Sequence, residues 1–362
     1  WANREAPLKA LKWMFDKEAP LLFRPQLDWD QWRWGLKFLA QCNDTAFERN
    51  VQQIVALGAY SHAALKDLVV STGIEYNRLE RGIAHFYTDQ KSFDAAGHAV
   101  EVMRKFGVQR RLVSRDELLK IEPAFKAYGD KITGGTYTST DESGDARVFT
   151  QELARRCAAR GAQFLYGHDV LRLNKIGDAI DSVAVIARNT GAGGQKDFIL
   201  KADAFVVACG SYSAPLLRTV GVDLPIYPGK GYSATFPLLK PEGAPMVSTI
   251  DDGKKIAMSR LGDVLRVAGT IELGGFDMSL DSPVARARCH MLSRRIAEIL
   301  PGVCDTRTPE EGGNPQYWTG LRPATPTNIP FIGQTRVGKL WVNAGHGTLG
   351  WTHGAGSGKA MA

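Results

Sequence analysis

Apolar positions that recur every three or four residues predict a helical first third of the chain. The longest run covers 43–72, where Phe47, Val51 and Ile54 fall on one side of a helix, and Gly73 is well placed as its C-cap. Shorter runs with the same spacing predict helices in the tryptophan-rich stretch 8–41 and at 89–106, 150–159 and 284–299.

Short apolar runs rich in β-branched residues predict strands in the rest of the chain. These runs lie at 82–88, 163–166, 180–187, 197–201 and 340–344, with an antiparallel group at 232–236, 255–260 and 264–269. The run 204–208 is apolar at every position, which favours a buried central strand over an edge strand. Strand–helix units at 150–222 and 320–362 therefore flank a region of antiparallel strands. This order indicates a discontinuous nucleotide-binding type of domain with a β-rich lobe inserted into it.

The composition is that of a globular protein and excludes a disordered chain, a collagen or a coiled-coil rod. Of the 362 residues, 44% are apolar and 23% are charged, and 45 basic against 38 acidic residues give a formal charge of +7. The basic residues are dispersed among acidic ones. We therefore expect no nucleic-acid partner, and at most a weak attraction for anionic substrates or lipid head groups.

The spacing of cysteines and histidines indicates neither a disulfide framework nor a metal site. The five cysteines form no CxxC pair, and no two histidines have the spacing of a metal-binding motif. A reducing compartment, and so a cytoplasmic location, is the simplest expectation. The sequence has no run of 18 apolar residues, so we expect no membrane span.

Three segments combine glycine with residue types that suit ligand binding. The first is 345–352, Gly-His-Gly-Thr-Leu-Gly-Trp-Thr, which follows a short strand and opens a glycine-rich helix. Its glycines let the backbone approach a flat ligand closely, and the N–H groups at a helix start suit a phosphate or the electron-rich edge of a reduced flavin. An ordinary tight turn between strand and helix explains the same pattern equally well.

The other two segments are weaker on their own. Gly210 follows the run 204–208, at the end of a strand where open α/β sheets bind nucleotides, although a turn glycine before a serine N-cap fits equally. Arg322 stands between Leu321 and Pro323, on a stiff backbone that suits a bidentate grip on a carboxylate. The sequence contains no GxSxG, HExxH or protein-kinase motif, which leaves hydrolase and phosphotransfer chemistry without support.

Taken in order, these segments resemble the FAD-dependent D-amino acid dehydrogenases of the small-subunit type. That family is a branch of the flavin amine oxidoreductases, together with D-amino acid oxidase, glycine oxidase and sarcosine oxidase. The resemblance runs from end to end and is carried by residues 7–15, TGGTYTSTDESGDARVFTQELAR at 133–155, ADAFVVACGSYS at 202–213, YPGKGYS at 227–233, YWTGLRPATP at 317–326 and GHGTLGWT at 345–352.

The resemblance implies an α/β (α+β) fold with a glutathione-reductase-like FAD-binding domain and an inserted antiparallel-sheet substrate domain. On this basis residues 133–222 and 320–362 form the FAD-binding domain, and residues 1–132 and 223–319 form the substrate domain with its helical N-terminal segment. The family begins with a strand, a GxGxxG turn and an acidic residue for the ribose, and the start of this sequence shows no such unit; its GxGxxG match lies at 345–350. We therefore expect the N-terminal βαβ part of the FAD-binding domain to be missing from it.

The resemblance also assigns roles to individual residues. Arg322 would clamp the substrate carboxylate, and the backbone carbonyl of Thr348 would accept a hydrogen bond from the substrate amine. The backbone near the flavin ring would come from Gly345, Gly347, Thr348, Leu349, Gly350, Trp351 and Thr352. Gly333 would sit beside the cofactor, Ala208 and Gly210 near its pyrophosphate, and Val170 against the adenine.

The implied reaction is oxidative deamination of a D-amino acid to a 2-oxo acid and ammonia. Hydride would pass from the substrate Cα to N5 of FAD, and electrons would leave to a quinone or another carrier. Two alternatives stay open: a related flavin dehydrogenase for a cyclic imino acid of the D-proline or hydroxyproline type, and a non-catalytic fragment that has lost FAD binding. The tryptophan-rich helices at 8–41 are expected in the core, with peripheral association on the inner face of the cell membrane as the alternative.

Overall fold

A computed structural model describes residues 2, 4, 6–7, 19–188 and 197–362 of the chain. The first part of the predicted helical stretch, at 8–18, lies outside these residues. Most of the strands in the described part form one mixed sheet in the order β13-β9-β12-β11-β10-β2-β4-β3, with β1 alongside β12. Its strands are β1 (Leu21–Phe23), β2 (Ile83–Tyr87), β3 (Arg110–Ser114), β4 (Gly134–Thr138), β9 (Tyr227–Pro237), β10 (Ser248–Asp251), β11 (Ile256–Leu261), β12 (Val264–Leu273) and β13 (Gln316–Ala324).

The two faces of this sheet differ in chemistry, because successive side chains of a strand point to opposite sides. One face carries the main hydrophobic core, in which Phe86, Tyr232, Met258 and Val267 pack with residues of α8 (Pro283–Ile299). The helices α5 (Arg115–Ile121) and η1 (Pro123–Lys131) also contribute to this core. On the opposite face, the alternate register of β9 and β13 places glycines beside Arg322, with the aromatic Tyr227 and Trp318 further along the strands. That face can therefore receive a polar ligand.

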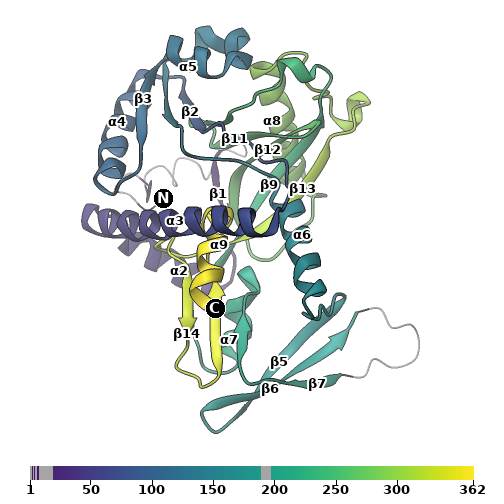
Figure 1. The fold of residues 1–362 in the computed structure, drawn as a ribbon. Coiled ribbons are helices and arrows are strands. Elements are labelled where there is room, and N and C mark those ends of the chain that lie inside the picture. Colours follow the sequence, from purple (N-terminus) through teal and green to yellow (C-terminus); the bar gives the residue numbers. More distant parts are fainter. Residues whose placement is uncertain (1, 3, 5, 8–18, 189–196) are drawn as a thin grey trace.

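Two smaller sheets form the other end of the molecule (Figure 1). β8 (Phe205–Val207) pairs in parallel with β15 (Leu340–Ala344), which pairs in turn with β14 (Phe331–Gln334). β5 (His168–Ile176), β6 (Ala179–Ala187) and β7 (Phe198–Lys201) form an antiparallel meander. A second core joins both sheets to α7 (Ser213–Arg218) through residues such as Leu173, Val207, Leu217 and Leu340.

Most of the predicted helices are confirmed. They are α2 (Trp29–Ala40), α3 (Asp44–Thr72), α4 (Gln90–Lys105), α6 (Ala146–Ala159), α8 and the terminal α9 (Gly350–Met361). Gly73 closes α3 in the left-handed conformation, as expected of a C-cap. α6 begins four residues earlier than the pattern predicted, since the Asp145 carboxylate accepts hydrogen bonds from the N–H groups of residues 147 and 148. In Figure 1, α3 and α9 cross between the large sheet and the smaller ones.

Two strand predictions were wrong. Residues 163–166 form no strand; the side chains of Phe164, Leu165 and Tyr166 are exposed, and the first strand of the meander begins at His168. The run 204–208 yields only the three residues of β8, with Val206 55% exposed. Within the part of the chain that the structure describes, β8 lies at the edge of its sheet and not at the centre. An apolar run indicates that its side chains favour burial, but it does not indicate which neighbouring strand or helix would bury them.

The predicted domain boundaries stay a prediction. β4 lies within the segment 133–222 that was assigned to FAD binding, yet it pairs with β2 and β3 in the large sheet. β13 crosses the predicted boundary at residue 320 and pairs with β9 along its whole length.

Candidate active site

Arg322 lies on the polar face of the large sheet, near the end of β13. It pairs with Gly229 of β9, and Gly320 pairs with Gly231. A Cβ atom at residue 231 would overlap Nη1 of Arg322, so the guanidinium lies directly over the glycine backbone. Only glycine at 231 leaves room for this position of the arginine.

Within the described residues, the Arg322 guanidinium has no counter-charge. Its side chain is half-buried, and desolvation lowers its pKa from the ordinary value. The described part of the chain offers it neither an ion pair nor a side-chain hydrogen bond, whereas the buried Asp251 pairs with Arg295 at 2.6 Å. Because a desolvated and unpaired cation is costly, the Arg322 guanidinium is suited to an anionic ligand.

The glycine-rich loop 345–349 lies against the same strand. Gly345 and Gly347 have φ values of 87° and 54°, which other residues rarely adopt. The Gly347 N–H donates a hydrogen bond to the carbonyl oxygen of Pro323 at 3.0 Å. The loop is therefore attached one residue away from Arg322, and these two predicted features share one site.

The segment after β8 reaches the same strand from another side. Gly210 opens the short helix η2 (Gly210–Tyr212), and the Ser211 hydroxyl donates to the carbonyl oxygen of Leu321 at 3.3 Å. Ala208, just before it, is exposed. Three motifs that are far apart in the sequence therefore meet around residues 321–323.

The start of α9 presents unsatisfied backbone donors beside this meeting point. Its N-cap residue, Leu349, makes no side-chain hydrogen bond to the helix, so the first-turn N–H groups of residues 350–352 have no cap. Thr348, Gly350 and Thr352 are exposed. The Trp351 ring packs instead against Tyr76 and Phe149, with ring centroids 5.7 and 5.2 Å away. The backbone of this turn, and not the tryptophan side chain, is available to a ligand.

Comparison with known proteins identifies the family. The family model described as FAD dependent oxidoreductase matches residues 22–362. The chain belongs to this family. A D-amino acid dehydrogenase of Dechloromonas aromatica (strain RCB) is 46% identical over 362 residues, which cover all of this chain and 83% of that relative.

Solved structures of FAD-dependent oxidoreductases share the fold. Glycine oxidase from Geobacillus kaustophilus matches with a TM-score of 0.70 and 23% identity, covering 85% of this chain and 78% of that one. Reduced L-alpha-glycerophosphate oxidase from Mycoplasma pneumoniae with FAD bound matches with a TM-score of 0.64 and 14% identity, over 84% and 78% of the two chains. The α/β fold predicted from the sequence is confirmed.

The residues of this oxidoreductase fit a flavin at the loop and helix start. The uncapped N–H groups of 350–352 are donors for the electron-rich edge of the ring, and the helix start adds a partial positive charge. Gly333 of β14 pairs with Val342 two positions before the end of β15, and a Cβ atom there would meet open space. FAD would thus be held by backbone from the 345–352 segment.

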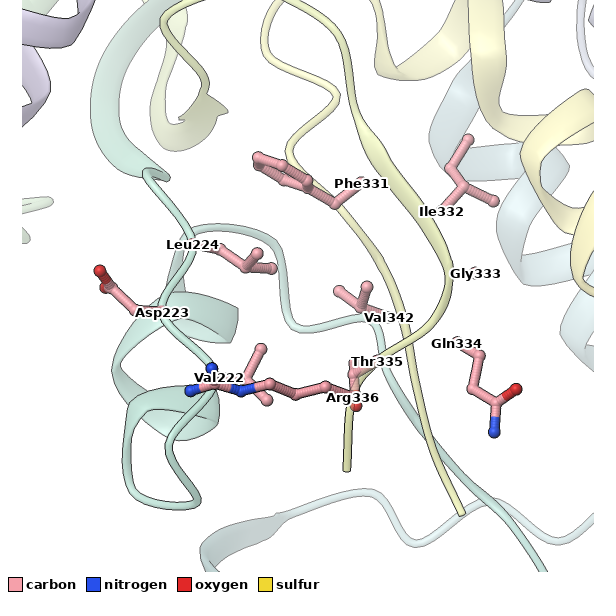
Figure 2. Close-up of a pocket in the computed structure, with 10 residues that line it drawn as sticks. All are labelled: Val222, Asp223, Leu224, Phe331, Ile332, Gly333, Gln334, Thr335, Arg336 and Val342. Carbon is pink, nitrogen blue, oxygen red and sulfur yellow. The ribbon is translucent and has the colours of Figure 1, made fainter. Parts of the chain in front are cut away.

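Gly333 also lines a cavity of about 420 Å³ between β14 and residues 222–224. Figure 2 shows Phe331 pointing from β14 toward Leu224, while Ile332 and Gln334 point to the other side of the strand. Val170, in contrast, lies in the meander, paired with Val185 on β6. It belongs to a different sheet from Gly333 and from β8, which precedes Ala208, and its predicted adenine contact stays a prediction.

One residue of the candidate site, Gly231, was not predicted from the sequence. Its role in admitting the Arg322 guanidinium depends on a side chain from a different strand. The available signal was the spacing of Gly229 and Gly231, two glycines on one face of a predicted strand, which indicates a close approach of another group.

Proposed function

We propose that this FAD-dependent oxidoreductase oxidatively deaminates D-amino acids to 2-oxo acids and ammonia. The observation that carries the proposal is the unpaired Arg322 guanidinium beside the 345–349 loop. The 46% identity with a protein named D-amino acid dehydrogenase, over the whole chain, supports the substrate class. A cofactor-binding fragment without activity would have no need of a desolvated cation in this position.

The chain's own residues would bind and orient the substrate. The planar guanidinium of Arg322 can hold both oxygens of an α-carboxylate, and the Thr348 carbonyl oxygen can accept a hydrogen bond from the amine. With these two groups fixed, the Cα–H bond of only one enantiomer points toward the cofactor, which gives stereoselectivity by position. Bound FAD supplies the acceptor for the hydride that leaves Cα. Water then hydrolyses the imino acid to the 2-oxo acid and ammonia.

Anaerobic mixing of the FAD-loaded enzyme with single amino acids tests this function. D-Alanine should bleach the flavin absorption and release pyruvate and ammonia in equal amounts, whereas L-alanine should do neither. A panel that includes D-proline separates the cyclic imino acid alternative, which would require bleaching by D-proline and none by primary D-amino acids. An enzyme that binds FAD but is bleached by no D-amino acid would refute the proposal.

We further propose that electrons leave to a quinone or another carrier. The name dehydrogenase of the D. aromatica relative supports an acceptor other than oxygen. With D-alanine as substrate, a quinone analogue coupled to a dye should sustain turnover at least tenfold faster than air-saturated buffer does. Equal rates in an oxygen electrode and in the dye assay would contradict this acceptor.

A membrane surface is a further proposed partner, on the cytoplasmic face of the cell membrane. Helix α2 is apolar on two sides: Trp34 is buried in the core, where its indole N–H donates to the Ala324 carbonyl at 2.9 Å. On the other side Trp29 and Leu36 are 73% and 64% exposed. Exposed Trp32 and Leu39 fall on the same side, with Lys37 beside them. Aromatic rings flanked by basic residues suit the interface of an anionic bilayer.

The expectation that the tryptophans of this stretch pack in the core is thus met by Trp34 and not by Trp29. By length and composition alone, α3 could also cross a membrane, a property shared by core helices of soluble proteins. The peripheral proposal needs only the exposed side of α2.

Replacing Trp29 and Leu36 together by glutamine is expected to reduce pelleting with phosphatidylglycerol-containing vesicles severalfold, because each lost side chain removes apolar area from the bilayer. Replacing Tyr166, an exposed aromatic residue outside α2, by glutamine is the matched control and should leave pelleting unchanged. Equal pelleting of the double variant and the unaltered enzyme, at low and at high salt, would rule out this surface.

A further inference from the structure

A partly buried hydrogen bond links the glycine-rich loop to α9. His346 lies in the loop between two glycines, and its Nε2 atom is 3.0 Å from the hydroxyl oxygen of Ser357. Ser357 lies two turns into α9 and is 1% exposed. Its hydroxyl also contacts two carbonyl oxygens of its own helix, those of His353 at 2.9 Å and Gly354 at 3.2 Å.

These contacts favour a proton on Nε2 of His346. A serine inside a helix commonly donates to the carbonyl four residues before it, which assigns the single hydroxyl proton of Ser357 to the His353 carbonyl, 2.9 Å away. The hydroxyl oxygen is then an acceptor, and His346 must donate to it from a protonated Nε2. Burial, together with the neighbouring ring of His353, lowers the pKa of His346 to about 4. The imidazole is therefore uncharged at neutral pH.

The bond between His346 and Ser357 is the second of two contacts that hold the loop in place. On one side the Gly347 N–H bonds to Pro323, next to Arg322. On the other side the His346 ring reaches back over the uncapped first turn of α9 to Ser357. The loop is thus held between the strand that carries the substrate arginine and the helix that offers the backbone donors.

We propose that His346 is a positioning residue, whose Nε2–H bond to Ser357 fixes the 345–349 loop over the start of α9 in the conformation that receives the flavin. The alternative is a cationic histidine that compensates the negative charge of a reduced flavin. The two roles predict different results for His346→Gln. A glutamine amide can replace the Nε2–H donor, so the variant should be tolerated in the positioning role. It cannot carry a charge, so it should not be tolerated in the cationic role.

The experiment measures FAD affinity by flavin fluorescence, a readout that does not require substrate turnover. His346→Asn, whose amide is too short to reach Ser357, and Ser357→Ala should each raise the FAD dissociation constant roughly two- to tenfold, the worth of one neutral hydrogen bond. His346→Gln should restore the affinity of the unaltered enzyme. The double variant should bind no more weakly than either single one, because both remove the same bond.

A matched control removes a serine from a helix where no histidine meets it. The Ser71 hydroxyl donates to the Leu68 carbonyl on α3, at 3.1 Å, and contacts no histidine among the described residues, so Ser71→Ala should leave FAD affinity unchanged. The second readout is the ¹⁵N spectrum of the histidine rings in the FAD-loaded enzyme. His346 should show a protonated Nε2 and an unprotonated Nδ1 at pH 7.

Three results would overturn the proposal. They are FAD binding that is unaffected in both Ser357→Ala and His346→Asn, a failure of His346→Gln to restore affinity, and a ¹⁵N pattern of an imidazolium or of an Nδ1-protonated ring. An enzyme that binds FAD and still oxidises no D-amino acid would refute the proposed function alone. The comparison of FAD affinities would stand in that case, which keeps the two failures apart.

Discussion

Replacing Arg322 by lysine is expected to raise the KM for D-amino acids about ten- to a hundredfold. The guanidinium offers two parallel N–H donors to a carboxylate, and a single ammonium group cannot reproduce both bonds. Loss of a hydrogen bond to a charged group is worth about 1.5–3 kcal/mol, and each 1.4 kcal/mol is about a factor of ten. Steady-state kinetics with D-alanine measure the effect directly.

The same position makes an unusual prediction about stability. Arg322→Leu should remove activity and yet leave the free energy of unfolding of the flavin-free protein unchanged or higher. The reason is that the variant replaces a desolvated cation, which has no partner in the described structure, by an apolar side chain. Urea unfolding of the flavin-free form is the measurement. A loss of stability of several kcal/mol would indicate that Arg322 has a structural partner, and would contradict its assignment to the substrate.

Arg295 provides the matched control on the other face of the sheet. Its guanidinium bonds to Asp251, which is fully buried, and it also pairs with Glu298 at 2.7 Å. Arg295→Lys should therefore lower stability and leave the KM for D-alanine unchanged, the reverse of the result for Arg322. An equal effect of both substitutions on KM would show that the change reflects general loosening of the sheet.

Periodicity predicted the elements that depend on a single, continuous face. α3, α4 and α8 and the antiparallel strands β9, β11 and β12 all cover the predicted ranges to within one residue, because each buries one stripe or one alternate set of side chains, although β9 begins five residues earlier and β12 ends four residues later than predicted. The segments 163–166 and 204–208 failed for a common reason. Their apolar residues indicate that the segments favour burial against a neighbouring strand. The sequence of each segment contains no information about which strand that neighbour is.

The candidate site was predictable at the level of motifs and not at the level of contacts. The three glycine- and arginine-containing segments were singled out from the sequence, and the structure brings them together through the bonds Ser211–Leu321 and Gly347–Pro323. The place of Gly231 beneath Arg322 and the bond between His346 and Ser357 were not predicted. Both are relations between side chain and backbone that exist only after β9 meets β13 and the loop folds back on α9.

The position of α9 depends in turn on α3, and one glycine controls their approach. The Gly356 N–H donates to the Ser61 hydroxyl at 2.9 Å, and a Cβ atom at residue 356 would come within 2.7 Å of the Ser61 Cα. Because the atom struck belongs to the backbone of α3, a side chain cannot turn aside to make room. The two helices can accommodate a larger residue only by moving apart.

Replacing Gly356 by alanine is therefore expected to lower the free energy of unfolding by about 1–3 kcal/mol, the usual cost of overpacking a close contact. FAD affinity should fall with it, because a shift of α9 displaces both the uncapped first turn and Ser357, to which the loop is attached. Urea unfolding and flavin fluorescence measure the two effects on the same preparation.

The matched control is Gly358, which lies two residues after Gly356 on the same helix. A Cβ atom there would meet nothing within 4 Å, and the position is exposed. Gly358→Ala should raise the free energy of unfolding by about 0.5–1 kcal/mol, since alanine favours a helix interior over glycine. Opposite signs for the two glycine substitutions would separate helix propensity from helix packing. Equal stabilisation by both would show that α9 can move away from α3 without cost, and that its contact with Ser61 does not hold the flavin-binding turn in place.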